Sequence, residues 1–249
     1  MNSISIIIPT LNEAKNISKL IWHLNTQSTT TIIKEIIVVD GGSNDGTKDI
    51  ITNAMLGKSK SSTGEEHSPS LEFIPIKLFT SAKGRAKQMN HGARNATGSI
   101  LYFLHADSFP PNGYDRLIFH HVQGGNKAGC FKMKFDSNHW WLQLAGWFTK
   151  FNWKACRGGD QSLFVTKELF DEIGGYNDTY AIYEDIDLIN QLYDKTTFTV
   201  IQEHLITSAR RYQKNSVWKL QYHFWMIYFK KWMGASSQEL EAYYLKYVQ

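Results

Sequence analysis

The sequence predicts an α/β protein whose mostly parallel sheet is flanked by helices and followed by a helical appendage at the C-terminal end. Short apolar runs alternate with stretches of helical periodicity up to about residue 108. This alternation is typical of parallel strands joined by right-handed crossovers. The chain has 249 residues, of which 42% are hydrophobic and 20% charged. That length suits one large domain with a modest appendage, and that composition is typical of a globular protein.

Four strands are expected in the first half of the chain. Residues 3–9 (SISIIIP) and 35–40 (EIIVVD) are runs rich in β-branched side chains. Such runs are typical of strands that are buried on both faces. Two further strands are expected at about 71–79 and 99–105.

Helices are expected between these strands. The first carries apolar residues at helical spacing, namely Ile17, Leu20, Ile21 and Leu24. Ser43 or Asn44 is expected to cap the second helix, which carries Ile50 and Ile51. The third runs from about residue 84 to 96. The polar, serine-rich stretch 57–70 is expected to be a surface loop.

The second half of the chain is less regular. The expected elements are strands at 128–135 and 161–166 and helices at 140–152, 184–195, 216–233 and 238–248. The helix at 184–195 carries Glu184, Asp185 and Asp187 in its first turn, where carboxylates interact favourably with the helix dipole.

Charge and cysteine usage exclude several classes of protein. The net charge of +4 is spread along the chain, and without a nucleic-acid-binding motif we expect no nucleic-acid partner. Cys130 and Cys156 lack metal-ligand spacing and are expected to be buried, and so few thiols suggest a reducing compartment. The apolar stretch 220–229 is far short of the roughly 20 residues that span a bilayer. No secretory leader is expected, so we expect a cytoplasmic protein, soluble or bound peripherally at the membrane.

Carboxylates mark the predicted ligand edge of the sheet. No GxGxxG follows the first strand and no GxxxxGK[ST] occurs, which disfavours a nicotinamide enzyme and a P-loop nucleotidase. Ligands of parallel sheets bind beyond the carboxyl ends of the strands. Asp40 and Asp107 lie at or just past such ends, so both should face one crevice. With the later Asp185, they could accept hydrogen bonds from a base or ribose, or hold a divalent cation beside a diphosphate.

Six motifs occur in the order seen in glycosyltransferase family 2. They are SIIIPTLNE, EIIVVDGGSNDGT, GRAKQMNHGA, LHADS, GDQ and YEDIDL. Over roughly residues 3–192 the chain therefore resembles this family, the inverting transferases with the Rossmann-like GT-A fold. The forms LHAD, GDQ and SARR are similar to a small bacterial subgroup linked to arsenosugar-type biosynthesis.

The resemblance implies a role for each matching residue. Asp40 would hydrogen-bond the uracil or ribose of a uridine diphosphate sugar, and Arg85 would approach its base and phosphates. Asp107 would be the metal ligand, for magnesium or manganese, and Asp185 the general base. The other implied nucleotide- and donor-binding residues are Pro9, Thr10, Glu13, Gly42, Ser43, Asn90, His105, Ala106, Arg210 and Arg211. The implied acceptor or donor-sugar pocket consists of Gly159, Asp160, Gln161 and Glu184.

Two positions depart from the family pattern. His105 stands where the first carboxylate of the DxD motif usually lies, and imidazole contributes less negative charge to a cation site. Gly41 stands where many relatives carry a second aspartate.

The QxxRW motif of processive synthases is absent, which favours transfer of a single sugar. The resemblance implies a nucleotide-binding half at 1–108 and an acceptor half at 109–212, followed by a helical segment at 213–249.

Several alternatives stay open. Adjacent Arg210 and Arg211 could grip a diphosphate or be a solvated surface pair. The stripe Trp218, Tyr222, Trp225, Phe229 and Trp232 is expected to pack on the domain or on a second subunit in a homodimer. Its alternative is a membrane-surface helix, with Trp141, Leu144, Trp147 and Phe148 on the same surface. A membrane contact would suit a lipid-linked acceptor such as a polyprenyl phosphate. A non-catalytic nucleotide-sugar-binding protein is the remaining hypothesis.

Overall fold

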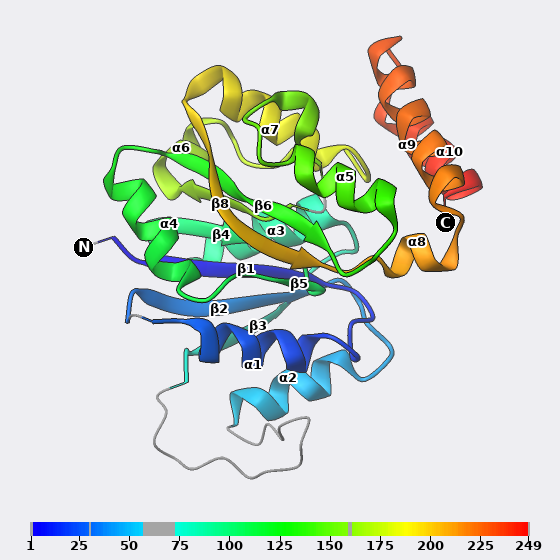
Figure 1. The fold of residues 1–249 in the computed structure, drawn as a ribbon. Helices are drawn as coiled ribbons and strands as arrows, with labels where there is room; N and C mark the ends of the chain where they lie inside the picture. The colour runs from blue at the N-terminus through cyan, green and yellow to red at the C-terminus, as the bar shows by residue number, and fades with distance from the viewer. Residues whose placement is uncertain (1, 30, 57–72, 159–160, 249) are drawn as a thin grey trace.

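The computed structural model describes residues 2–29, 31–56, 73–158 and 161–248. One sheet forms the centre of the molecule, with helices on both of its faces (Figure 1). Its strand order is β3-β2-β1-β4-β7-β6-β8-β5. The predicted α/β class with a mostly parallel, helix-flanked sheet is therefore confirmed.

The four parallel strands of the first half are β1 (Ile4–Thr10), β2 (Ile33–Asp40), β3 (Ile76–Thr80) and β4 (Ile100–Phe103). Every residue of β1 is buried, as expected of a strand covered on both faces. The register pairs Thr10 with Asp40 and Asp40 with Thr80. The carboxyl ends of these strands therefore lie at one edge of the sheet.

Alternate side chains of β1 build two separate cores. Ile6 and Ile8 pack on one face with helices α1 (Ile17–Gln27) and α2 (Thr47–Met55). Ile7 packs on the other face with helix α3 (Arg85–Asn95). This separation follows from the two-residue period of a strand.

The second half adds antiparallel pairs to the sheet. Its elements are β5 (Ser108–Phe109), α4 (Tyr114–Gln123), β6 (Ala128–Phe135), α5 (Trp140–Phe148), the 3₁₀ turn η1 (Lys154–Cys156), β7 (Leu163–Thr166), α6 (Lys167–Glu172), α7 (Glu184–Lys195) and β8 (Phe198–Thr207). β7 pairs antiparallel with β4 and β6, whereas β8 pairs parallel with β6 and antiparallel with β5. The strand at 128–135 and the helix at 184–195 match the predictions, but α4, α6, β5 and β8 were not predicted.

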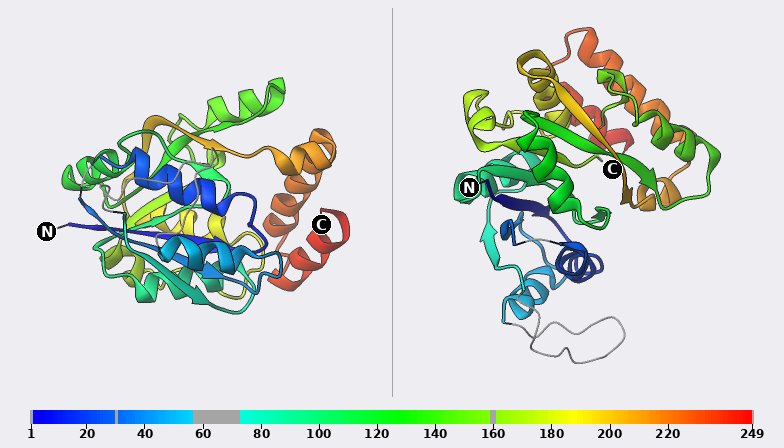
Figure 2. Two further views of the ribbon diagram at one scale, coloured as in Figure 1. Left: turned by 90° about the horizontal axis from the view of Figure 1, so that it is seen from below. Right: turned by 60° about the vertical axis from the view of Figure 1, so that its left-hand side comes forward.

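Three helices end the chain: α8 (Arg210–Lys214), α9 (Val217–Trp232) and α10 (Ser237–Tyr247). α9 and α10, orange and red, lie side by side beyond the sheet (Figure 2). Leu220 and Ile227 of α9 and Leu240 of α10 form a small core of their own. A Ser236 capping box begins α10. None of the helices in the described part of the chain combines the length and the hydrophobicity that a membrane span requires.

Four local predictions need correction or fall outside the described residues. α2 begins after Gly46 (φ 89°), so neither Ser43 nor Asn44 is its cap. Cys130 is buried, but Cys156 is only half-buried. The aromatic stripe of α9 does not pack fully on the domain, because its five side chains are 49–79% exposed. The loop expected at 57–70 lies outside the described residues, as do Gly159 and Asp160.

Candidate functional site

Asp40 ends β2 as a fully buried carboxylate. Its Oδ2 accepts hydrogen bonds of 2.9 Å from the backbone N–H groups of Gly42 and Ser43. Gly42 has a φ of 96°, a conformation that favours glycine. Among the described residues, Oδ1 has no hydrogen-bond partner. A buried acceptor without a partner is costly, so Oδ1 is suited to a ligand N–H or O–H.

Gln88 packs closely against Gly41, the residue that follows Asp40. Its Nε2 donates to the backbone oxygens of Thr10 (2.8 Å) and Val39 (2.7 Å). A Cβ at Gly41 would lie 3.0 Å from the Gln88 amide. A side chain at this position would therefore require the Gln88 amide to shift by a few tenths of an ångström.

The segments that follow β1 and β2 are held together by hydrogen bonds from backbone N–H groups to side-chain oxygens. The Asn12 N–H donates to Ser43 Oγ and the Glu13 N–H to Thr47 Oγ1, each at 2.9 Å. Asn12 itself has a positive φ of 57°, which turns the chain sharply after the strand. These contacts bring Glu13 to the edge where Asp40 lies.

Arg210 joins Glu13 to Asp107. Its Nη1 donates to Glu13 Oε2 at 2.9 Å, and its Nε lies 3.2 Å from Asp107 Oδ2. The pairing of β5 with β8 brings the two segments together, and the Ser208 N–H donates to the Asp107 backbone oxygen. Arg211 points elsewhere, because its Nη2 donates to the Tyr244 hydroxyl of α10. Arg210 therefore contacts residues at the strand edge, whereas the adjacent Arg211 contacts α10.

Arg85 joins the start of α3 to the start of α7. Its Nε lies 2.6 Å from Glu184 Oε1 and its Nη2 3.6 Å from Asp185 Oδ2. Tyr183 (φ 76°) precedes the helix, so both carboxylates lie in its first turn, at the positive end of the helix dipole. Glu184 is fully buried. Burial raises the pKa of its carboxyl, and the Arg85 guanidinium partly opposes that shift.

Asp185 lies where two cavities meet. The larger, of about 400 Å³, is lined by apolar and aromatic side chains and also by Arg85, Gln161 and Asp185. The smaller is lined by His105, Gln161, Tyr176 and Asp185. Asp185 is thus shared by the small cavity beside His105 and by the larger apolar cavity, which Arg85 also lines.

The remaining predicted residues have distinct surroundings. Asn90 exchanges hydrogen bonds with the backbone of Tyr176 and donates to Asp178 Oδ1 at 2.6 Å. These contacts tie α3 to the segment before α7, and a donor-binding role for Asn90 stays a prediction. Pro9 and Thr10 end β1, and Ala106 is buried next to Asp107.

Sequence reasoning missed Gln88 and Arg157. Gln88 lies three residues after Arg85 in GRAKQMN, so its place on the helix face toward the strand ends was a usable signal. Arg157 is 4% exposed, lines the larger cavity and donates to the backbone oxygens of Thr149 and Phe151. No local pattern marks it.

A cation site fits only in part. Among the described residues, no three His, Cys, Asp or Glu side chains gather as a ligand set. Magnesium is, however, commonly held by one or two carboxylates together with substrate phosphates. The Asp107 side chain is 20% exposed at the strand edge. A cation shared with a diphosphate therefore fits Asp107, whereas an all-protein cage does not.

The fold is shared with solved glycosyltransferases of low sequence identity. Staphylococcus aureus TarS 1–349 in complex with UDP superposes with a TM-score of 0.63 at 16% identity, covering 83% of this chain and 60% of that one. The Pyrobaculum calidifontis mannosyltransferase PcManGT, in complex with GDP-Man and Mn²⁺, gives a TM-score of 0.61 at 18% identity, covering 98% and 64%. These likenesses confirm the GT-A fold.

Curated relatives are similar over part of the chain. The Haloferax volcanii glycosyltransferase AglE is 32% identical over 107 residues, which are 43% of this chain and 31% of the relative. A Mycobacterium bovis PGL/p-HBAD biosynthesis glycosyltransferase is 26% identical over 210 residues, 82% of this chain and 75% of the relative. The chain thus spans about a third of the length of AglE. The Glycosyl transferase family 2 model matches residues 5–176, more than half of the sequence, and the chain belongs to that family.

Proposed function

We propose that this chain transfers a single sugar, with inversion, from a nucleotide-diphosphate sugar to an acceptor hydroxyl. The observation that carries the proposal is the position of Asp185, which lines the large apolar cavity together with Arg85 and also borders a void of about 10 Å³ beside His105. A general base of an inverting transfer must lie within hydrogen-bond reach of the acceptor hydroxyl whose proton it takes.

The donor is proposed to bind at the carboxyl edge of the parallel strands. Asp40 Oδ1, buried and without a partner among the described residues, would accept a hydrogen bond from the base or ribose. We favour a uridine donor. UDP is bound in the TarS structure, but the PcManGT structure holds GDP-Man, so the base is a point for experiment.

Asp185 is proposed to accept the proton of the attacking hydroxyl, a step worth about 10²–10⁴ in rate. Arg85, 3.6 Å from its Oδ2, would orient the carboxylate. The diphosphate leaves already charged, so no acid is needed to protonate it, unlike in a glycoside hydrolase. Arg210 would exchange Glu13 and Asp107 for phosphate oxygens. A magnesium or manganese ion held by Asp107 and the diphosphate would stabilise the developing negative charge.

The Asp185→Asn variant tests the proposal. It should lose transfer by at least about 10²-fold while keeping donor binding, because the amide cannot accept the proton. Asp187→Asn, in the same first turn, is the matched control and should keep its activity. Donor binding is measured by thermal shift with uridine and guanosine diphosphate sugars, with and without manganese. Turnover by Asp185→Asn equal to that of the parent would remove Asp185 from the mechanism.

The nature of the larger cavity favours a second candidate, transfer to a polyprenyl phosphate at the membrane. Trp141, Phe224 and Ile227 give the cavity an apolar wall, and Arg211 adds a cation. A non-catalytic protein would instead bind the donor without transferring or hydrolysing it across an acceptor panel. The arsenosugar-type subgroup is supported by motif forms alone and stays a proposal.

A further inference from the structure

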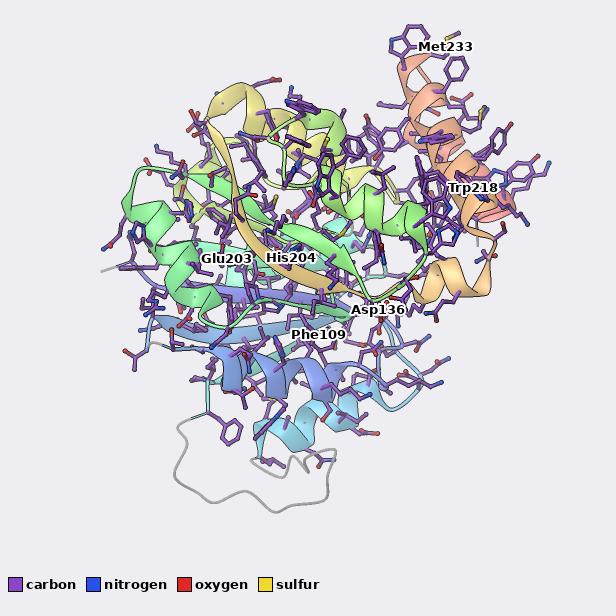
Figure 3. All side chains as sticks on the ribbon, in the orientation of Figure 1. Phe109, Asp136, Glu203, His204, Trp218 and Met233 are labelled. Atoms are coloured by element: carbon purple, nitrogen blue, oxygen red, sulfur yellow. The ribbon has the colours of Figure 1, made fainter. Side chains whose placement is uncertain are left out.

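Helices α5 and α9 carry a large exposed set of aromatic and apolar side chains, here called the aromatic surface. It consists of Leu144, Trp147 and Phe148 on α5 and Trp218, Tyr222, Trp225, Phe229 and Trp232 on α9. The five side chains of α9 follow spacings of four and three, so they lie on one stripe of the helix. Their exposed fractions run from 49% for Trp218 to 79% for Trp232. Trp218 and Met233, labelled in Figure 3, mark the two ends of this helix.

The two helices contribute to one continuous surface. The Trp141 ring of α5 lies with its centroid 5.3 Å from that of Trp218 and 6.2 Å from that of Trp225. Leu144, Phe148 and Tyr228 are each more than a third exposed, and each also lines the large cavity. The aromatic surface therefore shares Leu144 and Phe148 with the wall of the cavity that reaches Asp185.

The charges on this surface have one sign. Neither α9 nor the stretch 137–156 contains an aspartate or glutamate, and the two stretches together carry five lysines. Lys150 Nζ lies over the Trp147 ring, 3.7 Å from its centroid, and Lys219 is exposed beside the stripe. Within the described part of the chain, acidic side chains approach these lysines from neighbouring elements: Asp194 pairs with Lys154, Asp187 interacts with Lys231, and Glu239 interacts with Lys230.

We propose that the aromatic surface docks the protein on an anionic phospholipid bilayer. Tryptophan and tyrosine favour the lipid–water interface because one part of each side chain is apolar and another is polar. Lysines beside them can reach anionic headgroups. A second copy of the chain is a poorer occupant, because a two-fold interface would bring the same lysine-bearing, acid-free helices together.

Docking in this way opens the cavity toward the bilayer. An acceptor anchored in the lipid could then extend its hydroxyl to Asp185 without leaving the membrane. This consequence rests on the proposed function, whereas the docking itself does not.

Vesicle flotation tests the proposal. The full chain is floated with vesicles of phosphatidylcholine alone and of phosphatidylcholine mixed with phosphatidylglycerol. The test variant is Phe229→Ser/Trp232→Ser, because these rings contact each other (5.9 Å) and line neither cavity. The matched control is Met55→Ser/Leu56→Ser, which removes two exposed apolar side chains at the end of α2. A donor thermal shift on each variant reports the nucleotide-sugar site separately.

The parent should float with the anionic vesicles, and added salt should weaken this binding. The test variant should lose about tenfold or more in partitioning, while the control binds like the parent and all variants keep their donor shift. The proposal would be overturned if the parent protein floated with neither kind of vesicle. It would also be overturned if the parent and the test variant floated equally. A parent dimer that binds no lipid and becomes a monomer in the test variant would overturn it too. If the unmodified chain shows no thermal shift with a nucleotide sugar, this result would contradict the proposed function but not the proposed membrane docking.

Discussion

Replacing Arg85 with methionine removes a cation that lies against a buried carboxylate. The Arg85 Nε lies 2.6 Å from Glu184 Oε1, and the Glu184 side chain is 0% exposed. Removing one partner of a buried ion pair costs about 3–5 kcal/mol. Arg85 is 37% exposed, and Glu184 can take up a proton, so we expect a smaller loss of about 1–3 kcal/mol at alkaline pH. In a chain of this size each kcal/mol lowers Tm by roughly 2–4 °C.

The loss should depend on pH. Burial raises the pKa of Glu184 in the folded protein, so the folded state binds this proton more tightly than the unfolded state. The stability from that proton is fully present below the unfolded pKa and is lost as pH rises through the folded pKa. Without Arg85 the pKa of Glu184 rises further. The Tm difference between Arg85→Met and the parent should therefore be small at about pH 5 and grow toward about pH 8.

Differential scanning calorimetry without ligand measures this difference. The variant Arg85→Met/Glu184→Gln is the matched comparison, because a neutral amide cannot titrate. The growth of the Tm difference with pH should disappear in it. If Arg85→Met and the parent differ by the same Tm at both pH values, Glu184 is not the group that Arg85 stabilises.

Three further changes test the core and the metal. Gly92→Ala should lower the free energy of unfolding by about 1–3 kcal/mol through overpacking, because its Cβ would lie 2.5 Å from Ile7 Cγ2. The control is Gly158→Ala, which has open space around it and should keep the Tm of the unmodified chain. Asp107→Asn should reduce the extra thermal shift that manganese adds to a nucleotide sugar, and an undiminished manganese effect would exclude Asp107 as a ligand. Burial raises the pKa of Glu35, but hydrogen bonds from an ammonium, an amide and hydroxyls outweigh it and lower this pKa to about 2. The stability from Glu35 is lost as pH falls through that value, so Glu35→Gln should lower Tm at neutral pH more than in acid.

The sequence predicted those elements whose burial is simple. β1 and β2 are covered on both faces, so their runs of isoleucine and valine mark them directly. β8 was missed because its middle residues, Gln202, Glu203 and His204, are exposed and polar. α4 was missed because it begins directly after a Pro-Pro-Asn-Gly stretch that is typical of a turn.

The positions of the candidate site residues were predictable where they depend on strand ends and not where they depend on long-range pairing. Asp40 follows from the rule that ligands bind beyond the carboxyl ends of parallel strands. The contact between Arg210 and Asp107 depends on the β5–β8 pair, and these strands are far apart in the sequence. Arg210 and Arg211 are adjacent, so no spacing in the sequence predicts which of them contacts Asp107. Their side chains reach different partners because the backbone turns into α8 at this point.

The division of the site between two parts of the chain has a consequence for specificity. The strand ends with Asp40 and Asp107 lie within residues 5–176, which the family model matches. Much of the wall of the large cavity comes from later residues, including Tyr183, Arg211, Phe224 and Tyr244. The proposed donor edge is carried by β1, β2 and β4, whereas α9 and α10 contribute to this wall. These two helices can therefore change the cavity without disturbing Asp40 or Asp107, whereas α8 contacts Asp107 through Arg210. Asp185 lies at the boundary between the two, in the first turn of α7. Under the proposed function, variation in α9 and α10 should therefore alter acceptor choice while leaving donor choice intact.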